Sequence, residues 1–308
     1  QRIDIGTMYK QVNPFEAKKR GAALSARNIA AHIEREVIDK PRGWRPLVYC
    51  WRGGNRSGAL ATILGAIGFQ VTLIEGGYKA WRAALVDDLP ALAARLHYRV
   101  VCGPTGSGKT RLLQSLVAEG AQVLDLEDLA CHRSSVLGHL PGQPQPGQKR
   151  FDSLIWAALR GFDPARPVYV ESESKKVGNV RVPDALMDAM RASPCIDLQL
   201  ADAERVALLL EDYDFFVQDP DLFIHRLQAL TELRGGDVVK GWEAQVRAGD
   251  LAAVVLDLLV RHYDPMYTAS IQRNFKQYPQ ALPLVLADRS AASMQAAAGA
   301  LVAATPQA

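Results

Sequence analysis

Hydrophobic residues along the chain fall into two patterns: short continuous runs, which predict buried strands, and stretches with helical spacing. Asn13 followed by Pro14 is typical of a helix start, and apolar residues then recur at three-to-five-residue steps up to Lys40. The next predicted elements are a buried strand at 46–50, a helix at 57–68 and a second strand at 71–74. This order of strand, loop, helix and strand predicts an α/β unit.

A second α/β pattern begins after residues 87–90, which we interpret as a domain boundary. Its predicted strands lie at 98–102, 123–126, 168–170, 196–200 and 284–287. Beyond Pro220 the pattern is mostly helical, up to an alanine-rich stretch at 291–304. The sequence therefore predicts an α/β protein with two domains, residues 1–90 and residues 91–308, the second with a helical C-terminal part.

Composition excludes two broad classes of protein. Hydrophobic residues make up 48% of the 308 positions and charged residues 22%, which are globular values and exclude a disordered chain. No apolar run reaches the roughly 18 residues that a membrane-spanning helix needs. The four cysteines are scattered, so we expect no disulfide framework and a reduced, cytoplasmic location.

Positive charge is concentrated at the front of the chain. Residues 1–95 carry 15 Lys and Arg against 8 Asp and Glu, whereas the remaining residues carry 21 against 25. We therefore expect a polyanionic partner to contact the front part first. The first residue is Gln1 and no signal-peptide pattern follows it, so we expect that the native amino terminus is missing.

Cys50 ends the first predicted strand and is followed by a glycine-containing loop and a helix. Amides of such a loop and the amino end of the helix point inward and form a cradle for an anion. The same donors, together with the guanidinium groups of Arg52 and Arg56, favour thiolate over thiol, so Cys50 is predicted to be a nucleophile. The other predicted binding residues of this loop are Gly53, Gly54, Asn55 and Ser57.

The spacing of this loop fits two chemistries. Cysteine, five residues, arginine and serine is typical of cysteine-dependent phosphatases, while rhodanese-type transferases use a similar loop to carry sulfur or selenium. The segment Leu73–Trp81 (LIEGGYKAW) resembles the closing strand, glycine pair and tryptophan helix of the rhodanese fold. The loop is one residue longer than is usual in that fold, and the opening strand and its aspartate-valine-arginine motif are absent. A wider ring of amides suits a tetrahedral oxyanion such as phosphate or selenophosphate.

The segment Gly103–Thr110 (GPTGSGKT) has the spacing of a phosphate-binding loop, and it lies between a predicted strand and a predicted helix, as that motif requires. Its amides can wrap a diphosphate, Lys109 can reach the terminal phosphoryl oxygens, and Thr110 is placed to hold Mg²⁺ if that ion is bound. The predicted binding residues here are Gly103, Thr105, Gly106, Ser107, Gly108, Lys109 and Thr110.

Acidic and polar residues downstream are candidate partners of this loop. Glu171 ends the strand at 168–170 in the usual place for a metal-binding carboxylate, with Glu173 and Asp125 as further candidates, although each is more often a solvated strand-end charge. Ser172 and Lys175 add donors for phosphate oxygens. The cluster 262–267 (HYDPMY) either lines a pocket or stacks on a base, or caps and packs a helix start.

The whole pattern resembles the bacterial tRNA 2-selenouridine synthases. The segments that carry this resemblance are CWRGGNRSG, LIEGGYKAW, GPTGSGKT, LDLEDLACHRSSVLG, PQPGQKRFDSLIW, VYVESESKKVGNVRVP and HYDPMY. The resemblance implies a transferase that converts 2-thiouridine at the tRNA wobble position to 2-selenouridine. It further implies S-geranylation by geranyl diphosphate, then displacement by selenium from selenophosphate, with Cys50 as the essential cysteine and no tightly bound cofactor.

Partners and alternatives follow from these two loops. We expect the tRNA anticodon stem-loop to contact basic residues of the front part, namely Arg20, Arg27, Arg42 and Arg45, and the target base to be extruded. The phosphate-binding loop holds either geranyl diphosphate or a nucleotide. One alternative function is a cysteine-dependent phosphatase or sulfurtransferase with a regulatory nucleotide-binding domain. Another is a nucleotide-switched tRNA-binding module in which Cys50 is dispensable.

Overall fold

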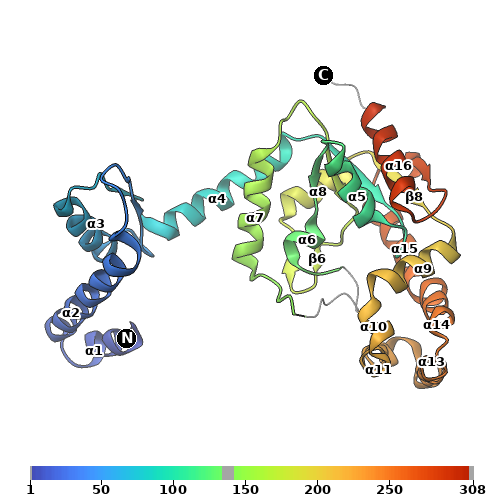
Figure 1. Ribbon diagram of the computed structural model, residues 1–308, viewed down its shortest axis with the longest axis horizontal. Coiled ribbons are helices and arrows are strands. Elements are labelled where there is room, and N and C mark those ends of the chain that lie inside the picture. Colours follow the sequence, from blue (N-terminus) through green and yellow to red (C-terminus); the bar gives the residue numbers. More distant parts are fainter. Residues whose placement is uncertain (1, 134–141, 305–308) are drawn as a thin grey trace. The chain divides into compact units, whose positions relative to one another are not determined.

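The chain forms two compact units in the computed structural model, which describes residues 2–133 and 142–304 (Figure 1). The division lies between Asp87 and Asp88, inside helix α4 (Gly77–Ala94). The predicted boundary at 87–90 is therefore no break in secondary structure. Alanine and leucine favour helix strongly enough for α4 to continue through Pro90. No helix in the described part of the chain is long and apolar enough to cross a membrane.

Unit 1, residues 1–87, consists of helices around two short strands. Its elements before α4 are α1 (Arg2–Gln11), α2 (Pro14–His32), the π-helical turn η1 (Ile33–Val37), β1 (Leu47–Val48), α3 (Asn55–Ile67) and β2 (Thr72–Leu73). The predicted helix start is confirmed, because the Asn13 side chain accepts a hydrogen bond of 2.8 Å from the amide of Phe15. Helix α1 was not predicted.

Strands β1 and β2 pair in parallel, with Leu47 opposite Thr72. The core of unit 1 contains Val48 and Leu64, but Leu47 is 59% exposed and Leu73 48% exposed. The prediction of a buried strand at 46–50 is therefore only partly correct. The apolar run predicts a strand, but burial of both faces also needs covering layers, and in the described part of unit 1 the sheet is two strands wide.

Unit 2, residues 88–308, is built on a five-stranded parallel sheet. Its strands are β3 (Tyr98–Cys102), β4 (Gln122–Leu124), β5 (Val168–Glu171), β8 (Cys195–Gln199) and β9 (Leu282–Val285), in the spatial order β4-β5-β3-β8-β9. The first strand of the unit therefore lies in the middle of the sheet, and ligands bind at the carboxyl edge of such sheets. All five predicted strands are present. Leu126, however, begins helix α6 (Leu126–Ala130) because Asp125 caps that helix.

Helices cover both faces of this sheet and extend beyond it (Figure 1). They are α5 (Lys109–Ala118), α7 (Gln148–Gly161), α8 (Asp184–Ala192), α9 (Asp202–Asp212), α10 (Asp214–Gln218), α11 (Pro220–Gln228), α12 (Thr231–Arg234), α13 (Gly236–Arg247), α14 (Leu251–Leu258), the π-helical turn η2 (Leu259–Tyr263), α15 (Asp264–Asn274), the 3₁₀ turn η3 (Tyr278–Gln280) and α16 (Ala291–Ala303). The hairpin of β6 (Lys176–Val177) and β7 (Val180–Arg181) was not predicted.

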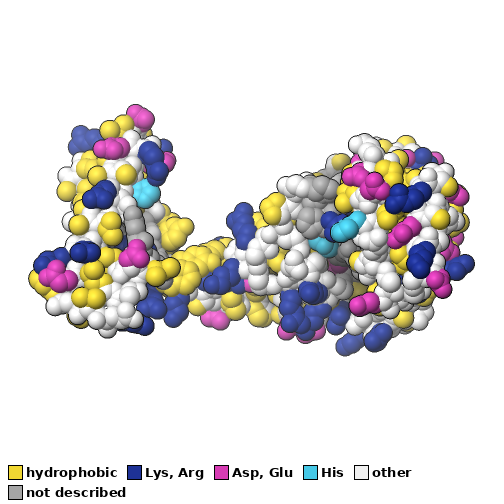
Figure 2. All heavy atoms as spheres, turned by 90° about the horizontal axis from the view of Figure 1, so that it is seen from below, with side chains coloured by type: hydrophobic (Ala, Val, Ile, Leu, Met, Phe, Trp, Pro, Cys, Tyr) yellow, Lys and Arg dark blue, Asp and Glu magenta, His cyan; other side chains and the backbone are white. Residues whose placement is uncertain are grey.

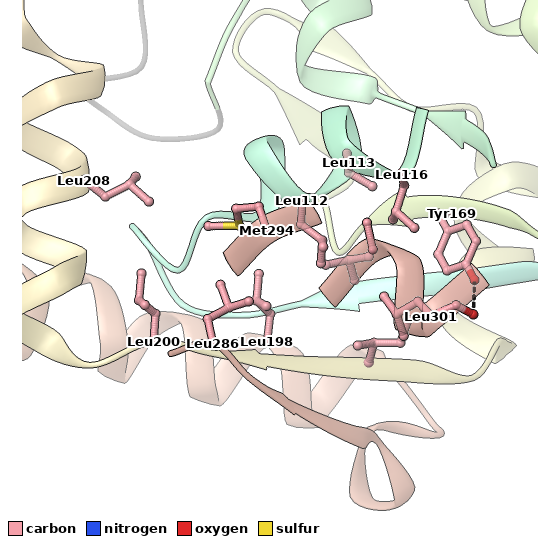
Figure 3. Packing of buried hydrophobic residues seen from close by; sticks show 13 residues of the cluster. Leu112, Leu113, Leu116, Tyr169, Leu198, Leu200, Leu208, Leu286, Met294 and Leu301 are labelled. Atoms are coloured by element: carbon pink, nitrogen blue, oxygen red, sulfur yellow. Dashed lines mark hydrogen bonds between the residues drawn. The ribbon is translucent and has the colours of Figure 1, made fainter. Parts of the chain in front are cut away.

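Two of the apolar clusters formed by the described residues position the helices of unit 2. In the first, leucines of α5 pack against Met294 and Leu301 of α16 and against the sheet (Figure 3), and the Tyr169 hydroxyl donates a hydrogen bond to the carbonyl of Leu301. The second joins α10, α11, α13 and α14 around Trp242. The helix that follows the Gly103–Thr110 loop is therefore fixed by the core, which in turn fixes the loop.

Candidate active sites

The Cys50 loop lies between β1 and the amino end of α3, as the sequence predicts. The hydroxyl of Ser57, itself 2% exposed, lies 3.2 Å from the Cys50 sulfur. Partial burial opposes ionisation of the thiol, but hydrogen bonds from the Ser57 hydroxyl and from the amides of Ser57, Arg52 and Gly54 outweigh it, so the pKa of Cys50 is lowered to about 6. The loop amides that we predicted thus contribute to the lower pKa, together with the Ser57 hydroxyl, whereas the guanidinium groups that we also predicted are not among the causes.

The glycine pair Gly76–Gly77 holds this loop in place. A side chain at Gly77 would collide with the Cys50 carbonyl oxygen, and the backbone there has a left-handed φ of 60°. This close approach lets the amide of Tyr78 donate to the Cys50 carbonyl at 2.9 Å and that of Lys79 donate to the Trp51 carbonyl at 3.0 Å. The segment 73–81 therefore shapes the active loop directly.

A cavity of about 450 Å³ opens at this loop, lined by Cys50, Trp51, Arg52, Gly54, Asn55 and Arg56. Gly53 is turned away from it, because a side chain there would lie 2.8 Å from the amide nitrogens of the glycine pair. The two arginines are exposed. The arrangement combines a thiolate, inward-pointing amides and two cations, which is the chemistry of a site for an oxyanion that reacts at sulfur.

The Gly103–Thr110 loop connects β3 to α5 and needs two of its glycines for steric reasons. Gly106 has a φ of 77° and Gly108 a φ of 90°. A side chain at Gly106 would lie 2.9 Å from Leu209 Cδ1, and one at Gly108 would collide with Met294. Ser107 is fully buried, and its hydroxyl has no hydrogen-bond partner. The backbone of this loop is thus held close to α9 and α16.

Lys109 and Tyr267 satisfy polar groups of the same loop. The Lys109 ammonium donates to the carbonyls of Gly103 at 2.6 Å and Pro104 at 3.3 Å. The Gly103 amide donates to the Tyr267 hydroxyl at 2.5 Å, and that hydroxyl lies 3.3 Å from the Ser172 hydroxyl. An anionic ligand would exchange with these internal contacts, since the ammonium can turn from the carbonyls toward phosphoryl oxygens.

Arg205 supports the loop from α9 and was not predicted from the sequence. Its guanidinium donates to the Thr105 carbonyl at 2.7 and 3.0 Å and forms a bidentate ion pair with Asp264. The side chain is 4% exposed, and Asp202 completes its hydrogen bonding. The one sequence signal for this contact was Asp264 within the 262–267 cluster.

A cavity of about 460 Å³ extends from the loop. Among its lining residues are Thr105, Gly106, Gly108, Lys109, Thr110 and Ser172, all of them predicted, and also Arg133 and Arg191. A smaller apolar recess of about 60 Å³ shares Thr105, Leu209, Tyr213 and Tyr263 with this cavity. Phe216 and Phe223, whose rings stack at 5.0 Å, line the recess. A ligand with an anionic head and an apolar tail fits this pair of spaces.

His262 also lines the larger cavity, from the turn η2, and is 1% exposed. Its Nδ1 accepts a hydrogen bond of 2.9 Å from Arg234 Nε, which is always a donor. Burial, and then the nearby guanidinium, lower the pKa of His262. The ring is therefore neutral with its proton on Nε2. The 262–267 cluster thus lines a pocket, which was one of its two predicted roles.

The acidic candidates are placed differently from what the sequence implies. Glu171 is 2% exposed and does not line the cavity; its Oε1 accepts hydrogen bonds from the amides of Leu126 and Glu127, and its Oε2 has no partner. Burial, then the neighbouring carboxylates, raise its pKa well above the usual value. Glu173 does line the cavity, and burial raises the pKa of Asp125 to about 6.

The acidic candidates do not cluster with further possible metal ligands among the described residues. Among residues 2–133 and 142–304, no group of three or more His, Cys, Asp or Glu side chains could hold a metal ion. Lys175 also lies away from the cavity, because it pairs with Asp184 at 2.7 Å on the surface. Of the predicted residues, those of the Gly103–Thr110 loop and Ser172 remain to bind a phosphorylated ligand, beside Arg133 and Arg191 of the same cavity.

The fold and the two sites define a rhodanese-like unit joined to a phosphate-loop unit. Residues 16–84 match the family of rhodanese-like domains, and residues 96–234 match the family described as tRNA 2-selenouridine synthase AAA domain. The chain belongs to the tRNA 2-selenouridine synthase family, as the sequence resemblance predicted.

Individual relatives support this assignment. The tRNA 2-selenouridine synthase of Alcanivorax borkumensis is 36% identical over 219 residues, which are 69% of this chain and 58% of the relative. That of Aeromonas salmonicida is 32% identical over 304 residues, 87% of this chain and 78% of the relative, and that of Hydrogenovibrio crunogenus is 30% identical over 308 residues, covering 89% and 82%. The chain thus spans less than two thirds of the first of these relatives. No solved structure is significantly similar to the chain.

Proposed function

We propose that the protein is a transferase that replaces the sulfur of 2-thiouridine in tRNA by selenium, as the names of its relatives indicate. The observation that carries this proposal is the presence of two anion-binding loops of different chemistry in one chain. One surrounds a cysteine whose pKa is lowered to about 6. The other adjoins an apolar recess. Two loops of this kind suit a reaction in two steps.

In the first step geranyl diphosphate binds to unit 2. The Gly103–Thr110 amides and Lys109 hold its diphosphate, and the apolar recess beside Thr105 receives the start of the prenyl chain. The sulfur of 2-thiouridine attacks C1 of the geranyl group, the C1–O bond breaks, and diphosphate leaves while the base loses its N3 proton to solvent. Positive charge on Lys109 stabilises the charge that develops on the leaving group.

A nucleotide is the other ligand that this loop could hold. Its base and ribose would need polar partners, whereas Leu209, Phe216, Val255 and Leu258 line the recess. The apolar lining favours the prenyl diphosphate.

In the second step selenophosphate binds at the Cys50 loop in unit 1. Alkylation has converted the sulfur into a leaving group. Selenium of selenophosphate adds at C2 of the base, the C2–S bond breaks, and geranyl thiol departs with a proton from solvent; water cleaves the Se–P bond and releases phosphate. Cys50 either lies beside the donor and positions it, or attacks selenium as a thiolate, which breaks the Se–P bond and releases phosphite. Only the second route requires the low pKa of Cys50, and its perselenide would need a thiol as reductant to release selenium to the base. Arg52 and Arg56 supply positive charge at the same cavity.

The tRNA would contact basic residues of unit 1. Arg20, Arg27, Arg42 and Arg45 are all exposed. On the face seen in Figure 2, Lys and Arg side chains of this unit are interspersed with hydrophobic and acidic ones, which fits several separate phosphate contacts better than one large patch. Binding should weaken steeply as salt rises, because each phosphate contact releases counterions.

Mass spectrometry of tRNA nucleosides tests the function. tRNA bearing 2-thiouridine is incubated with the protein and with geranyl diphosphate, selenophosphate or both. We expect the S-geranyl nucleoside with the first alone, and 2-selenouridine only when both are present. Selenouridine formed without geranyl diphosphate would refute the two-step order.

The competing function is a cysteine phosphatase or sulfurtransferase. It predicts that aryl phosphate or thiosulfate is turned over without tRNA. The tRNA assay and the aryl phosphate assay, run on the same protein preparation in the same buffer, distinguish the two functions.

A further inference from the structure

One wall of the Cys50 cavity is the indole ring of Trp51, the residue that directly follows the nucleophile. The Trp51 side chain is 39% exposed. Its ring centroid lies 5.2 Å from that of Tyr78, with 24° between the two planes, so the rings stack. Tyr78 lies in turn 5.5 Å from Trp81 of the same helix, α4. The cavity therefore has an aromatic wall that is supported from behind.

Backbone hydrogen bonds fix this wall relative to the sulfur. The Cys50 carbonyl accepts from the amide of Tyr78, and the Trp51 carbonyl accepts from that of Lys79. The residues that carry the sulfur and the indole are thus tied to the same turn of α4. A large apolar ring held in this way beside a polar anion site offers a flat surface to a planar ligand.

The chemistry of the second step calls for such a surface. A nucleophile adds to a trigonal ring carbon along the normal to the ring plane, so the base must lie flat with one face open to the selenium donor. The other face is then free to be covered. Aromatic side chains hold unpaired bases by stacking, and every base has a face to offer.

We propose that Trp51, supported by Tyr78, is the stacking platform for the pyrimidine base that receives selenium at Cys50. This inference rests on the proposed function and adds the residue that positions the base. Trp51 covers one face of the base, and the donor held over Cys50 reaches C2 from the other face. The platform recognises an unpaired, extruded nucleotide and not a double-stranded segment.

The test measures selenium transfer by the full chain to an anticodon stem-loop RNA that already carries S-geranyl-2-thiouridine. Variants are Trp51→Ala, Trp51→Phe, and Tyr49→Ala as a matched control, since Tyr49 is an aromatic neighbour that is 57% exposed and does not line the cavity. We expect kcat/KM to fall about 10- to 100-fold for Trp51→Ala, mainly through KM, and to recover largely in Trp51→Phe. Tyr49→Ala should match the wild type.

Two further measurements separate positioning from loss of structure. Alkylation of Cys50 by iodoacetamide as a function of pH should be unchanged in Trp51→Ala, and so should geranylation of unmodified 2-thiouridine RNA. Equal selenation by wild type and Trp51→Ala would refute the role of Trp51 as a stacking platform. So would an equal loss of selenation in Trp51→Ala and Trp51→Phe. Failure of the wild type itself to selenate the RNA would instead refute the proposed function.

Discussion

The two loops stabilise negative charge in opposite ways. Around Cys50 the amides converge on a side chain of the protein, so the loop already contains the anion that it stabilises. In the Gly103–Thr110 loop the charged side chain is a cation, Lys109, which bonds to carbonyls of its own loop. The first loop is built to supply a nucleophile, and the second to bind the anionic group of a ligand.

The support of the two loops differs as well. The Cys50 loop is held by one neighbouring turn, and most of its side chains are exposed. The other loop is held by helices distant in sequence, through Arg205, Met294 and Tyr267. For the proposed function, an open loop would admit a bulky tRNA base, whereas a more enclosed loop would exclude water from a prenyl diphosphate. Similar local motifs thus acquire different chemistry from their surroundings.

Cys50→Ala has the largest expected effect of the variants considered. We expect selenium incorporation to fall to the level without enzyme, because the nucleophile of unit 1 is gone, while geranylation in unit 2 continues. Nucleoside mass spectrometry measures both products in one sample. Selenation that survives in this variant would show that the cradle binds the donor without using its sulfur.

Lys109→Ala tests the other loop. Loss of one cation at the leaving diphosphate should slow geranylation by about 100-fold. Selenium transfer to RNA that is already geranylated should continue at the wild-type rate. Lys240→Ala, an exposed lysine of α13, is the matched control. An equal drop in both steps would mean that the loops do not divide the reaction between them.

Arg205→Met tests the buried support of the Gly103–Thr110 loop. Removal of one partner from a buried ion pair typically costs about 3–5 kcal/mol, because Asp264 would be left without its guanidinium. We expect a lower thermal unfolding temperature and weaker binding of geranyl diphosphate. Arg247→Met removes an exposed pair with Asp221, at 3.6 Å, and should leave both unchanged. Similar losses in the two variants would contradict the role of burial.

Ser57→Ala sharpens the account of the Cys50 loop. Loss of the hydroxyl hydrogen bond should move the pKa of Cys50 from about 6 toward the ordinary value of 9.0. The thiolate is present above the pKa, so a rise of about one unit would roughly halve the rate of alkylation at pH 7. The rate of reaction with iodoacetamide between pH 5 and 9 gives the midpoint. An unchanged midpoint would mean that the backbone amides alone lower the pKa of Cys50.

Glu171→Gln has the smallest expected effect. Burial raises the pKa of Glu171, so its contribution to stability is fully present below the unfolded-state pKa, near 4.5, and is lost as pH rises through the folded-state pKa. The neutral amide keeps the acceptor for Leu126 and Glu127 but carries no charge. We expect the variant to unfold a few degrees higher than wild type at pH 8, by about 2–4 °C per kcal/mol, and with little difference at pH 5. A difference in unfolding temperature that is the same at pH 5 and pH 8 would contradict a raised pKa of Glu171.

Local patterns in the sequence predicted both loops and the five strands of the larger sheet. Glycines at 106 and 108, and the cysteine loop before α3, specify backbone geometry over a few residues, so their meaning does not depend on distant contacts. Predictions that depend on distant contacts were less successful. Arg205 contacts Thr105 from 100 residues away, and no periodicity or spacing indicates that contact.

Burial was also beyond the local pattern. Leu47 and Leu73 belong to apolar runs that predict buried strands, but burial depends on which layers cover a sheet. The division at 87–88 falls within the boundary predicted at 87–90, but the local pattern did not show that helix α4 continues across it. Glu171 was expected at the phosphate loop, but it faces the amino end of α6 instead.

The hydrogen bond between Arg234 and His262 has a practical consequence for inhibitor chemistry. Because the guanidinium is always a donor to Nδ1, the proton of the neutral ring is on Nε2, and a compound that reaches Nε2 would meet an N–H and no lone pair. A compound that places a carbonyl or phosphonate oxygen opposite this nitrogen gains a contact that does not vary with acidity. A protonated amine placed there would bring a second donor to the N–H, and no hydrogen bond could form.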